Sequence, residues 1–95
     1  MIKPYKISVP KSTLNNIYKK VRAYPWKMMQ NVDGWEYGTN YNFLKKISQY
    51  WVSKYNWKKF EKKINSFKNY KTNVDGISLH FIMERSRNPK SRPLL

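Results

Sequence analysis

The sequence contains no cysteine and only one histidine, His80, in 95 residues. The absence of thiols excludes a disulfide framework and any thiolate zinc site. One imidazole is also too few for a transition-metal centre built from protein side chains alone. No apolar run approaches the roughly 18 residues of a membrane-spanning helix. The N-terminus lacks the apolar stretch of a signal peptide, so we expect a cytoplasmic protein.

Acidic residues are scarce, with five against 20 basic residues, which gives a formal net charge of +15. Sixteen of the basic residues are lysine and four are arginine. Proteins that recognise bases or bind phosphates through two parallel hydrogen bonds favour arginine. No Gly-rich RNP-type strand or zinc-finger spacing accompanies them. We interpret the charge as a solvated basic surface. A small basic module that binds nucleic acid or another anionic surface is the alternative, and only binding that persists at physiological salt would favour it.

Aromatic residues are abundant, at 17% of the chain. Four tryptophans, eight tyrosines and four phenylalanines can bury too much area for a disordered basic tail. The length allows one small domain or a piece of a larger one.

Apolar residues recur at helical spacing in three segments, which predicts three helices. The first helix has a stripe of Leu14, Ile17, Tyr18 and Val21, with Pro10 in its first turn and an end imposed by Pro25. The second begins after an N-cap at Thr39 or Asn40. Its inner row is Leu44, Ile47, Trp51 and Tyr55, widened by Phe43 and Tyr50. The third covers residues 57–66 after a cap at Asn56, and its apolar face is Trp57, Phe60, Ile64 and Phe67.

Residues 25–39 carry no period but contain two tryptophans and two glycines. A loop with so much aromatic bulk is expected to lie against another surface, inside or outside this chain.

The period then changes from 3.6 to 2 around Asp75-Gly76, which is typical of a two-residue type I′ turn. Residues 68–74 and 77–84 are therefore predicted to form a hairpin with at least one buried face. Folding about the turn pairs Val74 with Ile77, Thr72 with Leu79 and Tyr70 with Phe81 on that face, which Met83 continues. The opposite face is mixed and carries Ser78, His80, Ile82 and Glu84.

The two ends of the chain are extended. Residues 5–9 alternate and predict a short strand or an extended lead-in. Residues 85–92 form a polar connection, and Pro93-Leu94-Leu95 is similar to the start of an apolar strand.

No group of residues in the sequence predicts a catalytic, cofactor-binding or metal site. His80 alternates with apolar neighbours on a strand, which favours a structural histidine. Glu61 lies between two basic pairs and is expected to form ion pairs on the helix surface. Asp33-Gly34 and Asp75-Gly76 are turn sequences without calcium-loop spacing. Gly34 and Gly38 lack the strand–glycine–helix context of a phosphate-binding loop.

Six ordered pieces of the sequence resemble the order of motifs in one known protein family. Residues 4–10 (PYKISVP) are similar to the opening Phe-x-Ile-x-Val-Pro of that family. Residues 24–26 (YPW) stand where it has an aromatic–proline pair, usually in the order Trp-Pro. Residues 34–39 (GWEYGT), with Tyr41 and Leu44, are similar to its Trp-x-Tyr-Gly-x…Tyr-Leu segment.

The other pieces follow in family order. Similarity to Tyr-Trp…Asp-Trp-Arg…Glu…Leu-Asn is found at Tyr50-Trp51, Trp57, Glu61 and Asn65. The usual Asp, Arg and Leu of that piece are replaced by Asn56, Lys58 and Ile64. Similarity to Phe…Thr-x-Ile-Asp-Gly-x-x-Ile-His-Phe-Ile and to the strand after it is found at Phe67, Thr72, Val74-Asp75-Gly76, Leu79-His80-Phe81-Ile82 and Pro93-Leu94-Leu95.

Together these six pieces resemble the N-terminal region of the epoxide hydrolases related to the microsomal and juvenile-hormone enzymes. The resemblance implies an α+β fold class and an incomplete fold. A meander of about three helices would occupy residues 1–66 and pack against a hydrolase body and cap. Residues 67–95 would supply a β-hairpin, the first two strands of a truncated α/β-hydrolase sheet, and the start of a third strand. The partners would be the missing body and cap, and an epoxide would bind only in the complete enzyme. Nucleic acid is not an expected partner.

In such enzymes an aspartate attacks the epoxide carbon to form an alkyl-enzyme ester, and a histidine with an acidic partner activates the water that cleaves it. Cap tyrosines and a His-Gly-x-Pro turn stabilise the oxygen charges. Asp75 matches the hairpin turn and His80 matches the strand, so no catalytic residue is carried over. We therefore expect a non-catalytic portion of an epoxide hydrolase, inactive alone and present as a fragment, truncated gene or partial product.

Two further expectations follow from the resemblance. Animal members carry an N-terminal membrane anchor, whereas this chain opens at the lead strand, so we expect a soluble bacterial-type relative. A scaffold that docks on a separately encoded hydrolase body is a third hypothesis.

Overall fold

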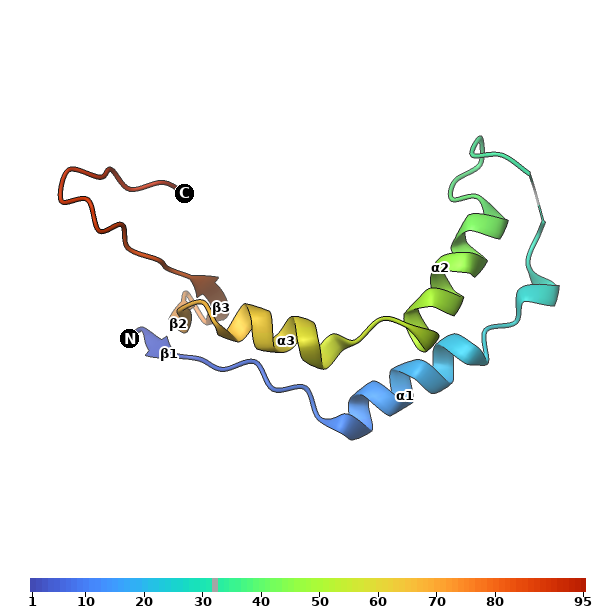
Figure 1. Cartoon of the computed structure of the whole chain (residues 1–95), viewed down its shortest axis with the longest axis horizontal. Coiled ribbons are helices and arrows are strands. Elements are labelled where there is room, and N and C mark those ends of the chain that lie inside the picture. Colours follow the sequence, from blue (N-terminus) through green and yellow to red (C-terminus); the bar gives the residue numbers. More distant parts are fainter. Residues whose placement is uncertain (32) are drawn as a thin grey trace. The chain divides into compact units, whose positions relative to one another are not determined.

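A computed structural model describes residues 1–31 and 33–95 of the chain. Val32, which belongs to the loop predicted over residues 25–39, lies outside the described residues. The elements follow in the order β1 (Lys3–Pro4), α1 (Lys11–Arg22), the 3₁₀ turn η1 (Trp26–Met28), α2 (Tyr41–Ser53), α3 (Trp57–Asn65), β2 (Asn69–Val74) and β3 (Ile77–Ile82) (Figure 1). Three helices and a small antiparallel sheet confirm the predicted α+β class.

The chain divides into two compact units. One unit contains residues 1–8 and 58–95, and the other contains residues 9–57. The boundary predicted between a helical part and a hairpin part, at residues 66 and 67, stays a prediction.

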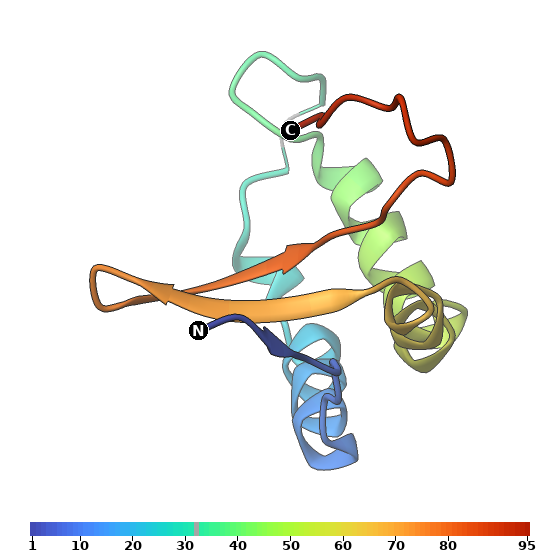
Figure 2. The same cartoon turned by 90° about the vertical axis from the view of Figure 1, so that its left-hand side faces the viewer.

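The sheet of the first unit has the order β1-β2-β3, with both pairings antiparallel. Figure 2 shows β2 between the short β1 and β3. The predicted register is confirmed, because Val74 pairs with Ile77, Thr72 with Leu79 and Tyr70 with Phe81. Asp75 and Gly76 have φ of 51° and 81°, the positive values that a type I′ turn requires.

Of the two alternatives predicted for residues 5–9, a short strand or an extended lead-in, the structure shows the extended lead-in. The strand covers only Lys3–Pro4, and the Tyr5 amide donates one more hydrogen bond to the Asn69 carbonyl at 2.9 Å. Beyond that point the backbone of Ile7 bonds to the side chain of Asn65 on α3 instead of to β2. From Ile7 onward the lead segment is therefore hydrogen-bonded to α3 and not to β2, so strand pairing stops there.

The helix ends are set largely by local chemistry. Pro10 is the N-cap of α1, one position before the first turn in which we expected it, and its carbonyl accepts from the Leu14 amide. The helix ends at Arg22, two residues before the Tyr24-Pro25 step, as predicted. Asn40 caps α2, since its Oδ1 accepts from the Phe43 amide at 3.0 Å.

The described residues contain no buried hydrophobic side chain. Among residues 1–31 and 33–95, the buried polar residues are Glu61 at 9% and Asn69 at 6% exposure. Within residues 1–31 and 33–95, no helix has the length and apolarity needed to cross a bilayer. The part of the chain that the structure describes is thus a set of well-formed elements without a hydrophobic core.

Candidate interaction surface

The most apolar row of α2 faces away from protein. Leu44, Ile47 and Trp51, predicted as its inner row, are 38%, 45% and 40% exposed. The half-buried positions are instead Tyr41, Lys45, Ser48 and Val52. On that side the Arg22 side chain of α1 donates to the Val52 carbonyl at 3.3 Å. The predicted inner row is therefore uncovered within this unit, because α1, the helix that contacts α2 here, packs on the more polar row.

The aromatic loop extends this apolar row at the start of α2. Trp35 contacts the ring of Phe43, with 5.2 Å between ring centroids, yet stays 59% exposed. Trp26 packs edge-on against Tyr41 at 5.6 Å, and the Tyr41 hydroxyl donates to the Trp26 carbonyl at 3.0 Å. The expectation that the loop lies against another surface is confirmed for Trp26 and only in part for Trp35.

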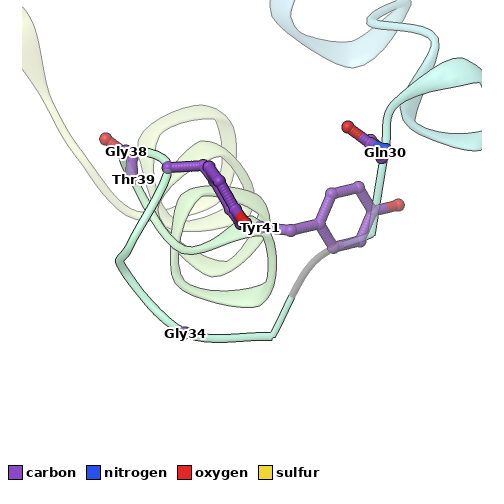
Figure 3. Close-up of a pocket in the computed structure, with 6 residues that line it drawn as sticks. Gln30, Gly34, Gly38, Thr39 and Tyr41 are labelled. Atoms are coloured by element: carbon purple, nitrogen blue, oxygen red, sulfur yellow. The ribbon is translucent and has the colours of Figure 1, made fainter.

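A shallow pocket of about 160 Å³ lies inside this loop (Figure 3). Its lining is Gln30, Gly34, Tyr37, Gly38, Thr39 and Tyr41. The loop bends tightly here, since Gly34 and Gly38 have φ of 98° and 128°. These six residues include no carboxylate and no imidazole, so the pocket offers no acid–base pair for catalysis.

The apolar face of the hairpin is also uncovered. Val74, Ile77 and Leu79 are 49%, 64% and 45% exposed. Tyr70 and Phe81 stack on each other with centroids 5.6 Å apart and are half-buried. The predicted buried face is therefore present in register but not buried, because no described element covers it.

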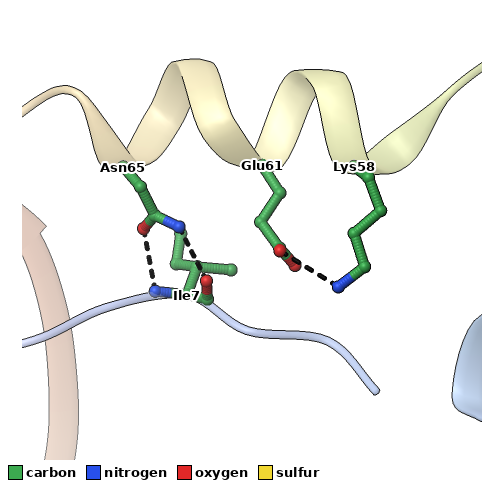
Figure 4. A network of polar contacts seen from close by, with 4 residues as sticks. All are labelled: Ile7, Lys58, Glu61 and Asn65. Carbon is green, nitrogen blue, oxygen red and sulfur yellow. Dashed lines mark hydrogen bonds and ion pairs between the residues drawn. The ribbon is translucent and has the colours of Figure 1, made fainter. Parts of the chain in front are cut away.

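Asn65 fastens α3 to the lead segment (Figure 4). Its Oδ1 accepts from the Ile7 amide at 2.9 Å, and its Nδ2 donates to the Ile7 carbonyl at 2.7 Å. On the same helix Glu61 forms the predicted ion pair with Lys58, at 3.1 Å. Glu61 is nevertheless buried, so the expectation of a surface position is wrong. The sequence marks Asn65 only as part of a family motif, and nothing in its local sequence indicates this contact.

Asn69 connects the end of α3 to β3. Its Nδ2 donates to the carbonyls of Ile64 and Phe67, both at 2.8 Å. Its Oδ1 therefore faces His80, whose Nε2 lies 2.9 Å away and acts as the donor. The His80 ring meets Tyr5 edge-on at 5.6 Å. Sequence reasoning missed Asn69, although an asparagine at the start of a strand is an unusual choice that could have indicated a side-chain role.

The residues whose side chains could take part in catalysis have structural roles in this fold. His80 holds a strand to Asn69, Asp75 forms the hairpin turn, and Glu61 pairs with Lys58. Among the described residues, no three His, Asp or Glu side chains come close enough to hold a metal ion. What the arrangement offers is two uncovered apolar surfaces: the row of α2 with Trp35, and the face of the hairpin.

Comparison with other proteins points to one family. The family described as "Epoxide hydrolase N terminus" matches residues 2–95. The chain is 34% identical over 94 residues to a Stigmatella aurantiaca protein named "Putative epoxide hydrolase", covering 99% of this chain and 21% of that protein. It is 30% identical over 97 residues to juvenile hormone epoxide hydrolase 1 of Ctenocephalides felis, covering 99% and 21%.

A solved structure shows the same arrangement of elements. The juvenile hormone epoxide hydrolase from the silkworm Bombyx mori superposes with a TM-score of 0.83 at 24% identity. The superposition covers 95% of this chain and 22% of the silkworm chain. The chain thus has the fold of that segment, and it spans about one fifth of the length of the relatives it matches.

Proposed function

Because this chain belongs to the epoxide hydrolase N-terminus family, we propose that it is the non-catalytic N-terminal portion of an epoxide hydrolase. Its task is to cover and brace a hydrolase body that carries the chemistry. The supporting observation is that the described residues bury no hydrophobic side chain, although the family match runs over residues 2–95.

The exposed surfaces have the character of interfaces between parts of one protein. Leu44, Ile47 and Trp51 form one continuous helical stripe, and large apolar patches of this kind mark surfaces that bind protein. If a body covers these three side chains, each contributes on the order of 1 kcal/mol of burial free energy, because more than half of each is already covered. The body in this proposal is the remaining four fifths of the relatives' length, for which this chain has no counterpart.

The chemistry of ring opening is assigned to that body. Epoxide hydrolysis through an ester requires a carboxylate free to attack the epoxide carbon and a general base that activates the water which then cleaves the ester. His80, the one imidazole, donates to a buried amide, and the carboxylate of Glu61 pairs with Lys58. Neither group is placed to attack an epoxide.

A chimera tests the proposal. The N-terminal segment of the Bombyx mori enzyme that superposes on this chain is replaced by residues 1–95, and a second protein lacks the segment altogether. We expect the chimera to fold and to hydrolyse the epoxide of juvenile hormone, because the body of the silkworm enzyme would cover the apolar row of α2 and the apolar face of the hairpin. The segment-deleted protein is expected to precipitate or to lose nearly all activity, as measured by diol formation.

The 95-residue chain assayed alone is the matched control, and we expect no diol above the buffer background. Diol formed by the isolated chain would contradict the assignment of chemistry to the body. A segment-deleted enzyme with full activity and unchanged melting temperature would contradict the bracing role.

A further inference from the structure

The tripeptide Val-Asp-Gly occurs twice in the chain, at residues 32–34 and at residues 74–76. An aspartate followed by glycine is the step at which a protein chain most readily rearranges to isoaspartate, because glycine has no side chain to shield its amide nitrogen. The two steps share the preceding valine as well, so their intrinsic reactivities are closely matched. A difference in rate between them therefore measures what the fold does to each step.

The rearrangement needs no reagent other than water. The glycine amide nitrogen attacks the side-chain carboxyl carbon of the aspartate and forms a C–N bond, while the nitrogen gives up its proton and one carboxyl oxygen leaves as water. Water then adds to the α-carbonyl of the resulting succinimide ring and breaks the bond between that carbonyl and the nitrogen. The product is isoaspartate, in which the main chain runs through the former side chain and the mass is unchanged.

The hairpin turn opposes this reaction at Asp75-Gly76. The Gly76 amide donates to Oδ1 of Asn73 at 2.9 Å, so the attacking nitrogen is engaged. Both residues of the step hold the positive φ values of a type I′ turn, which the pairing of Val74 with Ile77 closes. Attack requires the peptide between Asp75 and Gly76 to rotate until its nitrogen faces the carboxyl carbon. That rotation breaks the hydrogen bond to Asn73 and opens the turn.

At Asp33-Gly34 the structure has no such restraint. The step lies in the loop between η1 and α2, outside every described helix and strand (Figure 3). Among the described residues, none accepts a hydrogen bond from the Gly34 amide. The Asn40 side chain donates to the Gly34 carbonyl at 3.2 Å, but that oxygen belongs to the following peptide and not to the one that reacts. Both aspartates and both glycines are exposed, so access of water does not distinguish the two steps.

We propose that Asp33-Gly34 is a site of spontaneous isoaspartate formation, and that the type I′ turn protects the matching step at Asp75-Gly76. Isoaspartate adds a methylene group to the main chain two residues before Trp35. It therefore changes the position of the ring that contacts Phe43 with 5.2 Å between centroids. The reaction requires neither the proposed function nor an uncovered surface, because the reacting groups belong to adjacent residues of one chain.

The first test follows both steps in one sample. The 95-residue chain is kept at neutral pH and low salt and is digested with trypsin at intervals. Asp33 and Asp75 fall in separate tryptic peptides, residues 28–45 and 72–85. Isoaspartate changes the retention and the electron-transfer fragments of a peptide without changing its mass, which separates it from deamidation of asparagine. We expect it to accumulate at least roughly fivefold faster in peptide 28–45, since local opening must precede reaction at the hairpin.

The same chain in concentrated urea is the reference. There the two peptides should isomerise at rates equal within about twofold, because the turn is unfolded. Equal rates in the folded chain, or a faster reaction in peptide 72–85, would overturn the proposal. A ratio that persists unchanged in urea would also overturn it, because the difference would then come from the local sequence and not from the turn.

The second test is the variant Asn73→Ala, which removes the acceptor of the Gly76 amide. Isomerisation in peptide 72–85 should become severalfold faster, while the rate in peptide 28–45 stays the same. Asn42→Ala, a change at an exposed position of α2, is the control and should alter neither rate. An unchanged rate at Asp75 in the Asn73→Ala chain would contradict the protective role of this hydrogen bond.

Discussion

Two asparagines organise the first unit at the scale of single residues. The side-chain amide of Asn65 both donates to and accepts from the backbone of Ile7, as a neighbouring strand would. Asn69, which is buried, satisfies two carbonyls at the end of α3 and one imidazole nitrogen of β3. An amide suits both positions because it carries two donors and an acceptor on one rigid plane. These contacts keep the hairpin attached to α3, although no hydrophobic side chain among the described residues is buried.

Asn69→Ala tests this role. The change leaves the Ile64 and Phe67 carbonyls without their donor, which costs about 1–3 kcal/mol for buried groups. The hairpin amides that face β2, such as that of Leu79, should then exchange with deuterium at least roughly tenfold faster in the 95-residue chain at low salt.

Asn42→Ala is the control for that exchange experiment, because Asn42 lies exposed on α2. Its effect should stay within about 0.5 kcal/mol. Similar exchange rates for the two variants would show that Asn69 does not hold the hairpin.

At the scale of elements, α2 carries more apolar surface than α1 covers. The helix packs through Tyr41, Lys45, Ser48 and Val52 and leaves the row with Ile47 exposed. The hairpin does the same, with correct register and an uncovered face. The backbone hydrogen bonds within α2 and between β2 and β3 form locally, whereas the hydrophobic side chains of both elements are left uncovered by the described residues.

The substitution Ile47→Glu tests whether the exposed row of α2 is covered by a hydrolase body or is ordinary solvent-exposed surface. In the 95-residue chain the change should hardly alter the helix content measured by circular dichroism, because Ile47 is 45% exposed. In the silkworm chimera it should lower stability by about 2 kcal/mol or more, since a carboxylate then replaces buried apolar surface. The measurement is the temperature at which half of the epoxide hydrolysis is lost.

Gln49→Glu is matched to that variant, because it makes the same change in charge at another exposed position of α2. We expect this variant to leave the half-inactivation temperature unchanged within a degree or two. An equal loss in both variants would indicate a charge effect and not a covered apolar row.

At the scale of the whole molecule, the absence of a buried hydrophobic side chain among the described residues decides the behaviour of the isolated chain. Cooperative unfolding comes from a shared core that is lost all at once, and elements held mainly by local hydrogen bonds open separately. The chain should therefore be marginally stable and adhesive by itself.

We expect the isolated chain to bind the hydrophobic dye ANS and to unfold over a broad temperature range, as measured by fluorescence and calorimetry. The silkworm chimera should bind much less dye per molecule, because the body covers the apolar rows. A sharp calorimetric transition of a monomer without dye binding would contradict this expectation.

Much of the fold could be predicted because its signals are local. Asp75-Gly76 requires positive φ at both positions, and this alone fixes the register of Tyr70 with Phe81. The start of α2 follows in the same way from the capping side chain of Asn40. The ordered motifs of the chain were also sufficient to indicate its family.

The sequence by itself determined the helices, the turn and the apolar rows, because hydrogen bonds and periodicity act between neighbours in the chain. Only the tertiary structure decided that α2 turns Ile47 outward and that Glu61 is buried. It also decided that Asn65 binds Ile7 across 58 positions of sequence. A hydrophobic stripe shows that a helix needs a partner, but whether the stripe is covered depends on which other elements reach it in space.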